Sequence, residues 1–187
     1  LTDTPCCEPG KGLYFSEGGK AHGSANIRIQ KFTNADISEA EYLVLTFSRN
    51  ALAAGSTFRL NLSFILGGTD YVLADNTEVY YDNGETELQK ILVQGADAFK
   101  REMAFSVGAA DTITAYVPVD KIVFAYGEST AASPELLKAV GAIGFDFTDL
   151  GNKNEASIAN GDAVSVKEIS MLVPDDPTPE PPSEPDP

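Results

Sequence analysis

The residues best suited to chemistry in this chain are tyrosines that stand beside carboxylate and amide side chains. Tyr80 and Tyr81 are followed directly by Asp82 and Asn83, and Tyr71 also follows an aspartate. A tyrosine ring stacks on a sugar face while its hydroxyl hydrogen-bonds, and carboxylates and amides are suitable partners for sugar hydroxyls. We therefore predict a ligand platform formed by Tyr71, Tyr80, Asp82 and Asn83. The alternative is that these rings fill a core or cap its rim.

A second candidate surface comes from the polar residues of the clearest strand. In Phe58–Leu66, every second residue is apolar, and Arg59, Asn61 and Ser63 occupy the opposite phase. Because strand side chains alternate between faces, these three should form a polar row on one sheet face. Arg59 and Asn61 are thus candidate ligand contacts, and a simply solvated row is the alternative.

A catalytic site is not indicated. The single histidine, His22, lies in a glycine-rich segment, and no strained nucleophile turn, phosphate loop or dinucleotide fingerprint occurs. One histidine also makes a catalytic zinc or iron site improbable. Carboxylate pairs could support glycoside hydrolysis, but with 28 acids such pairs arise by chance at any spacing. We expect no enzyme, and a glycoside hydrolase stays a less favoured alternative.

The charge balance restricts the partners. The formal net charge is −15, with 13 basic residues against 28 acidic ones. No basic stripe is present to neutralise a phosphate backbone or an anionic membrane surface, so we expect no nucleic acid partner. No apolar run approaches the roughly 20 residues of a membrane span, and we expect no membrane insertion of this chain.

The elements that would position these residues are mostly strands. Period-two alternation also occurs at Leu43–Phe47, Ile27–Ile29, Met103–Val107 and Ile143–Phe147, and each segment is bounded by turn-forming residues. One short helix is predicted at Ser133–Lys138, where a serine cap precedes Pro134. The last strand changes phase between Val166 and Ile169, which predicts a β-bulge near Lys167 and Glu168. The fold class is therefore all-β, a sandwich of two antiparallel sheets with one short helix.

The order of these strands resembles the galactose-binding-like jelly rolls, which include carbohydrate-binding modules of secreted bacterial glycoside hydrolases. The segments that carry the resemblance are EYLVLTFS (41–48), the long strand 57–66, YVPVDKIVF (116–124), a short helix leading into AIGFDF (142–147), and AVSVKEISMLV (163–173). The resemblance implies a jelly roll that binds polysaccharide. Such modules often stack sugars on tryptophan, and this chain has none.

The resemblance also implies a structural calcium ion near a pairing of the last strand with the first. Calcium takes six to eight oxygen ligands from carboxylates and carbonyls. Glu17 near the first strand and Glu168 in the last approximate that location, and Asp146 and Asp149 are further candidates. Calcium is therefore the expected ion, although no EF-hand spacing occurs.

The two ends differ in composition from the body. Residues 174–187 hold seven of the eleven prolines, five acids and no base, which is typical of an extended spacer. We expect residues 1–10 to be a mobile leader. Cys6 and Cys7 are adjacent, and adjacent cysteines rarely bridge each other, so a lipidated cysteine or an intermolecular bridge is the alternative.

We therefore expect a β-sandwich domain at 11–173 that is followed by a linker and flanking modules. The predicted function is a non-catalytic carbohydrate-binding module of a secreted or cell-surface bacterial protein, located extracellularly. The alternative is a structural or protein-binding domain, such as an adhesin or scaffold unit.

Overall fold

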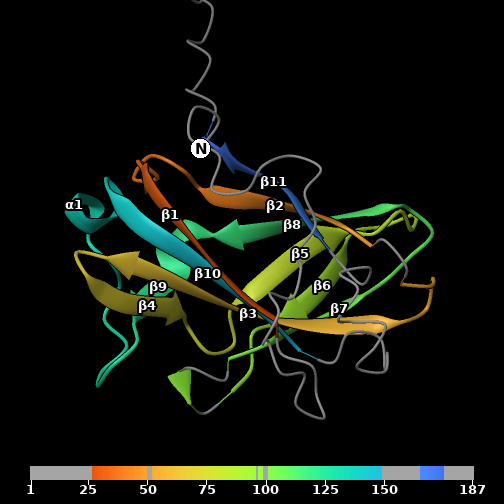
Figure 1. The fold of residues 1–187 in the computed structure, drawn as a ribbon, viewed down its shortest axis with the longest axis horizontal. Helices are drawn as coiled ribbons and strands as arrows, with labels where there is room; N and C mark the ends of the chain where they lie inside the picture. The colour runs from red at the N-terminus through yellow and green to blue at the C-terminus, as the bar shows by residue number, and fades with distance from the viewer. Residues whose placement is uncertain (1–26, 50–51, 96, 99–100, 149–164, 175–187) are drawn as a thin grey trace, which may run out of the picture.

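The computed structural model describes residues 27–49, 52–95, 97–98, 101–148 and 165–174. Two antiparallel sheets make up this part of the chain (Figure 1). The first sheet has the order β1 (Ile27–Ala35), β10 (Val140–Thr148), β3 (Thr57–Leu66), β4 (Thr69–Leu73) and β9 (Ile122–Phe124), and β7 (Met103–Ser106) also pairs with β3. The second sheet has the order β11 (Ser165–Leu172), β2 (Tyr42–Ser48), β8 (Thr112–Pro118), β5 (Glu78–Asp82) and β6 (Gln89–Leu92).

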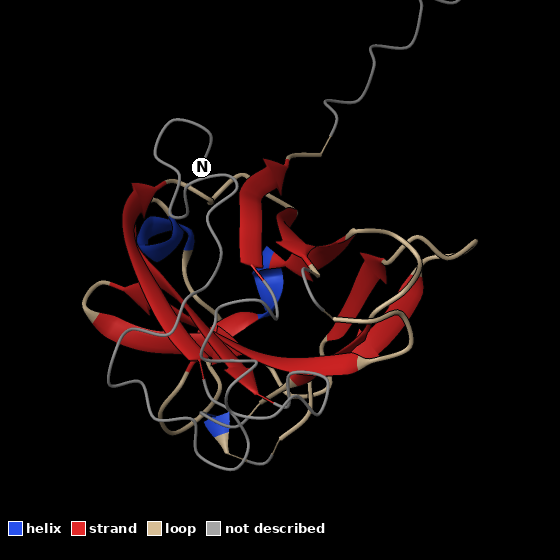
Figure 2. Cartoon of the chain, turned by 45° about the vertical axis from the view of Figure 1, so that its right-hand side comes forward, coloured by secondary structure: helices blue, strands red, loops and turns tan. Residues whose placement is uncertain are grey.

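The predicted fold class is confirmed. Within the described residues strands are the main regular structure, with loops and short helical segments between them (Figure 2). These include one α-helix, α1 (Pro134–Leu137), and a 3-10 turn, η2 (Val119–Lys121). The connections from β1 to β2 and from β2 to β3 each cross between the sheets. The molecule is an all-β sandwich.

The core lies between the sheets because each contributes one apolar face. Phe58 from β3 and Phe47 from β2 are fully buried, and their ring centroids lie 6.0 Å apart at an angle of 74°. Phe105 from β7 stacks on Phe58 at 5.2 Å, and Phe145 from β10 lies 6.5 Å from Phe47. Tilted and offset ring pairs of this kind add to the stabilisation from buried apolar area. These ring contacts pack the two sheets against each other.

Two local predictions about β11 have different outcomes. The register with β2 shifts between Val166 and Glu168, so the predicted bulge at this point is confirmed. The resemblance also implied that the last strand pairs with the first. Among the described strands, however, β11 pairs with β2, and β1 pairs with β10 in the other sheet.

Two glycine-containing turns connect strands in different ways. Gly67 and Gly68 join β3 to β4 with φ of 57° and 76°, and Leu66 pairs with Thr69. Two central residues with positive φ are the requirement of a type I′ hairpin turn. The Asn83-Gly84 dipeptide, by contrast, starts a longer loop, because Tyr81 pairs with Gln89 across β5 and β6. The tight two-residue hairpin that an Asn-Gly dipeptide favours therefore does not form at this point.

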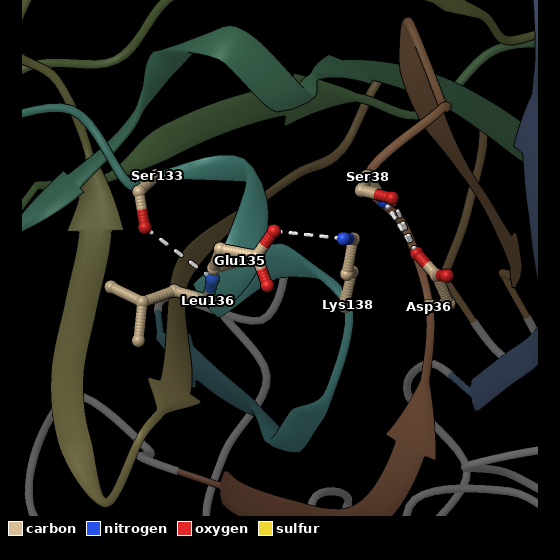
Figure 3. Close-up of polar contacts among 6 residues, drawn as sticks. All are labelled: Asp36, Ser38, Ser133, Glu135, Leu136 and Lys138. Carbon is tan, nitrogen blue, oxygen red and sulfur yellow. Dashed lines mark hydrogen bonds and ion pairs between the residues drawn. The ribbon is translucent and has the colours of Figure 1, made fainter.

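The short helix forms where it was predicted, and polar contacts surround it (Figure 3). The Ser133 hydroxyl accepts a hydrogen bond from the Leu136 N–H at 3.4 Å, and Lys138 donates to Glu135 at 2.8 Å. Nearby, the Asp36 carboxylate accepts from the hydroxyl and backbone N–H of Ser38, and these bonds lower the pKa of Asp36. The predicted leader (1–10) and nearly all of the predicted linker (174–187) lie outside the described residues.

Candidate ligand-binding face

Three tyrosines lie on the outer face of the second sheet. In β2, β8 and β5, one phase of the alternation is buried in the core, and the other phase carries Tyr42, Tyr116 and Tyr80. The register pairs Tyr80 directly with Tyr116, and Tyr116 with Val44 of β2. Directly paired side chains stand about 5 Å apart on the same face of a sheet. The pairing of three strands therefore gathers tyrosines that are far apart in the sequence.

These rings are accessible and held in place. The Tyr80 side chain is 40% exposed. The Tyr116 ring meets the Tyr42 ring edge to face, with centroids 6.4 Å apart and an interplanar angle of 87°. Rings fixed by neighbours lose little conformational freedom when a flat partner stacks on them. We call the surface formed by Tyr42, Tyr80 and Tyr116 the tyrosine face.

A row of oxygen-bearing side chains runs beside the tyrosines. Glu168 of β11 pairs with Thr46 of β2, Thr46 with Thr114 of β8, and Thr114 with Asp82 of β5. We call these four residues the hydroxyl row. The two threonines are partly exposed and the two carboxylates are exposed. With neighbouring strands about 4.8 Å apart, the row extends about 14 Å across the sheet.

The chemistry of this surface suits a polyhydroxylated ligand. Flat rings offer stacking surface, threonine hydroxyls donate and accept hydrogen bonds, and carboxylates accept them. Asp82 also accepts a hydrogen bond from the Gly84 N–H at 2.8 Å through Oδ1, which fixes the orientation of its carboxylate. The two rows run across the strands side by side, so an elongated ligand would contact both.

The predicted platform residues divide between this face and other positions. Tyr80 and Asp82 lie on it together, because both occupy the outward phase of β5. Tyr81 points the opposite way, is only 2% exposed, and packs its ring on Phe105 with centroids 5.1 Å apart.

Asn83 serves the loop after β5 rather than the surface. It is 3% exposed, its amide donates to the Ser106 carbonyl at 3.0 Å, and its Oδ1 accepts from the Glu85 N–H at 3.2 Å. The amide is therefore committed to the fold, and the structure does not bring Asn83 to the tyrosine face.

Tyr71 lies in the first sheet, apart from Tyr80. It is half-buried and contacts Phe124 with ring centroids 5.6 Å apart, and Phe124 in turn contacts the exposed Tyr126 at 5.6 Å. The Tyr126 hydroxyl donates to the Asp70 carboxylate at 2.9 Å, and this bond to the neutral hydroxyl raises the pKa of Tyr126. Tyr71 thus belongs to a three-ring cluster on the β4–β9 side.

Arg59 and Asn61 lie on β3, with their side chains on the outer face of the first sheet. Arg59 is exposed and makes an ion pair with Glu102 at 3.3 Å. Asn61 is nearly buried, at 8% exposure, where the pairing of β3 passes from β7 to β4. The predicted polar row is therefore on the opposite side of the sandwich from the tyrosine face, and only part of it is open.

Of the predicted calcium ligands, Glu168 is the one whose side chain the structure describes. Glu168 is exposed on β11, at the end of the hydroxyl row, while Glu17 and Asp149 lie outside the described residues. Asp146 is in β10 of the other sheet, and nothing is described of its side chain. Within the described ranges, no group of three or more His, Cys, Asp or Glu residues is arranged to hold a metal ion.

Sequence reasoning missed Tyr42 and Tyr116 as site residues. Both stand in the outward phase of strands whose inward residues are strongly apolar, Leu43–Phe47 and Ile113–Val117. The outward phase of each strand could be predicted from the sequence of that strand alone. The pairing of β2 with β8 and of β8 with β5, which places the two rings beside Tyr80, was not.

In the described part of the chain, no helix has the length and apolar character needed to cross a membrane. Comparison of the chain with family models, with curated proteins and with solved structures found no match.

Proposed function

We propose that the domain is a non-catalytic module that binds polysaccharide on the tyrosine face, in a secreted or cell-surface bacterial protein. The observation that carries the proposal is the direct pairing of Tyr80 with Tyr116 on an open sheet face, beside the hydroxyl row. Stacking surface and hydrogen-bonding groups are arranged there in adjacent rows.

The composition of the chain supports this proposal in two further ways. The net charge of −15 disfavours polyanionic partners such as nucleic acid. The proline-rich acidic sequence of residues 174–187 is typical of spacers that hold a binding module away from neighbouring domains.

A protein-binding role is the second candidate, and a specific observation favours it. Leu92 and Leu172 are exposed on β6 and β11, and their register partners Glu78 and Tyr42 place both leucines on the outer face of the second sheet. Exposed apolar side chains around aromatic ones are typical of protein interfaces. A protein partner would bury these two leucines against its own apolar side chains more fully than a flat sugar chain would.

Affinity electrophoresis of the full chain through gels that contain soluble polysaccharides tests the proposal. We expect retardation by at least one polysaccharide, and loss of that retardation in Tyr116→Ala. Tyr126→Ala serves as the matched control, because it removes an exposed tyrosine from the other sheet. Absence of retardation by any plant, host or microbial polysaccharide would favour the protein-binding role.

A further inference from the structure

The hydroxyl row carries a carboxylate at each end. Asp82 closes it on β5 and Glu168 closes it on β11, with Thr114 and Thr46 between them. A polymer chain that contacts the threonines therefore lies against at least one of the two carboxylates. An ionised carboxylate only accepts hydrogen bonds, so it pairs with sugar hydroxyls but not with a second carboxylate or a sulfate group.

The cationic side chains near this face do not neutralise the two end carboxylates of the hydroxyl row equally. Lys90, which pairs with Tyr80 across β5 and β6, is held by Glu78 at 3.3 Å. Lys167 lies in the bulge of β11, next to Glu168. Asp82, by contrast, is followed by the exposed Glu85 and Glu87 in the loop that leads to β6. The negative charge is therefore concentrated at the Asp82 end.

We propose that the hydroxyl row makes the tyrosine face selective for neutral over anionic polysaccharides, and that Asp82 imposes most of this selectivity. The inference rests on the proposed function, because it assigns the class of polysaccharide bound at the same face. A carboxylate or sulfate of a ligand that lies about 4 Å from Asp82 is repelled, and even in a water-like dielectric this repulsion corresponds to about a fivefold loss of affinity. Neutral hydroxyls at the same position gain a hydrogen bond instead.

Pairs of polymers that share a backbone and differ in whether their substituents are neutral or anionic provide the test. Hydroxyethylcellulose against carboxymethylcellulose is one pair, and highly methyl-esterified against de-esterified galacturonan is another. We expect the full chain to be retarded more strongly by the neutral member of a pair in affinity gels at low salt. Added salt should narrow this difference, because surface charges are screened within about 10 Å at 0.1 M.

Three single substitutions separate the effect of local charge on binding from the effect of net charge: Asp82→Asn, Glu168→Gln and Glu128→Gln. Asp82→Asn keeps the Oδ1 acceptor for the Gly84 N–H. We expect it to raise affinity for the anionic polymer by about fivefold, with a smaller rise in Glu168→Gln. Glu128→Gln removes one charge from the loop after β9 in the other sheet and should change nothing.

The outcomes distinguish the two proposals. Equal or tighter binding of the anionic member, or equal effects of Asp82→Asn and Glu128→Gln, would overturn the charge selection and leave polysaccharide binding intact. No retardation by either member of any pair or by any other polysaccharide would contradict the proposed function and this inference with it.

Discussion

Tyr80 and Tyr81 are adjacent in sequence and should respond to truncation in opposite ways. Tyr81 is 2% exposed, packs on Phe105, and its hydroxyl accepts a hydrogen bond from the Ser106 N–H at 3.1 Å. Removing a buried aromatic ring costs about 3–5 kcal/mol of unfolding free energy, because contacts are lost and a cavity remains. Tyr80 is 40% exposed on the outer face, so Tyr80→Ala should cost at most about 1 kcal/mol.

Urea denaturation and thermal denaturation, both followed by far-ultraviolet circular dichroism, measure the two losses of unfolding free energy on the full chain. For a chain of this length, each kcal/mol lowers the thermal midpoint by about 2–4 °C. Tyr81→Ala should therefore lower it by about 6–20 °C, and Tyr80→Ala by no more than about 4 °C. Tyr81→Phe keeps the ring and removes only the acceptor of the Ser106 N–H, so it should cost about 0.5–1.5 kcal/mol.

The comparison refutes the assigned facing of β5 if the two alanine variants lose equal stability, or if Tyr80→Ala loses more. In either case the outer face of the second sheet would not carry Tyr80, and the tyrosine face would be incorrectly assembled. A large loss in Tyr81→Phe with a small further loss in Tyr81→Ala would show that the hydrogen bond, rather than the ring, stabilises this position.

Three further results are expected. Leu62→Ala, which truncates a core residue of β3, should lower the free energy of unfolding by about 2–5 kcal/mol. Asn61→Ala should lower it by about 1–3 kcal/mol, because the amide is nearly buried. A larger drop of the urea midpoint in Asn61→Ala than in Leu62→Ala would refute this order. Deletion of Pro174–Pro187 should leave the thermal midpoint unchanged, since a proline-rich acidic sequence buries little, and a drop of several degrees would show that it packs on the domain. Tyr126 should titrate above its usual pKa near 10, because its neutral hydroxyl donates to Asp70; this contribution to stability is present below pH 10 and disappears as the pH rises through the raised pKa. The difference between the absorbance titrations of the parent and Tyr126→Phe reports the Tyr126 phenol alone, and a midpoint of that difference near the usual pKa of about 10 would show that the bond is absent.

Much of the fold was predictable because its signals are local. The alternation in Phe58–Leu66 fixed which residues of β3 face the core, and the phase change around Lys167 located the bulge in β11. The serine cap and Pro134 likewise marked the start of α1. Each of these features depends on residues that are neighbours along the chain, so a single sequence contains the information.

The candidate site was predictable only in part because it depends on long-range pairing. Tyr80 and Asp82 share a strand, and their common face follows from their spacing. Tyr71 and Asn83 are close in sequence to them, yet Tyr71 enters the other sheet and Asn83 turns inward to the Ser106 carbonyl. Tyr116 reaches Tyr80 through a pairing of β5 with β8 that no local pattern encodes.

The most direct test of the tyrosine face is a nuclear magnetic resonance titration of the full chain with selectively labelled tyrosine rings. The chain has seven tyrosines, and a polysaccharide that retards it in affinity gels serves as the titrant. We predict that the ring signals of Tyr42, Tyr80 and Tyr116 shift together with one dissociation constant, while those of Tyr71, Tyr81 and Tyr126 stay in place. Shifts concentrated at Tyr71 and Tyr126, with none at Tyr80 and Tyr116, would contradict the assignment of the site to the second sheet.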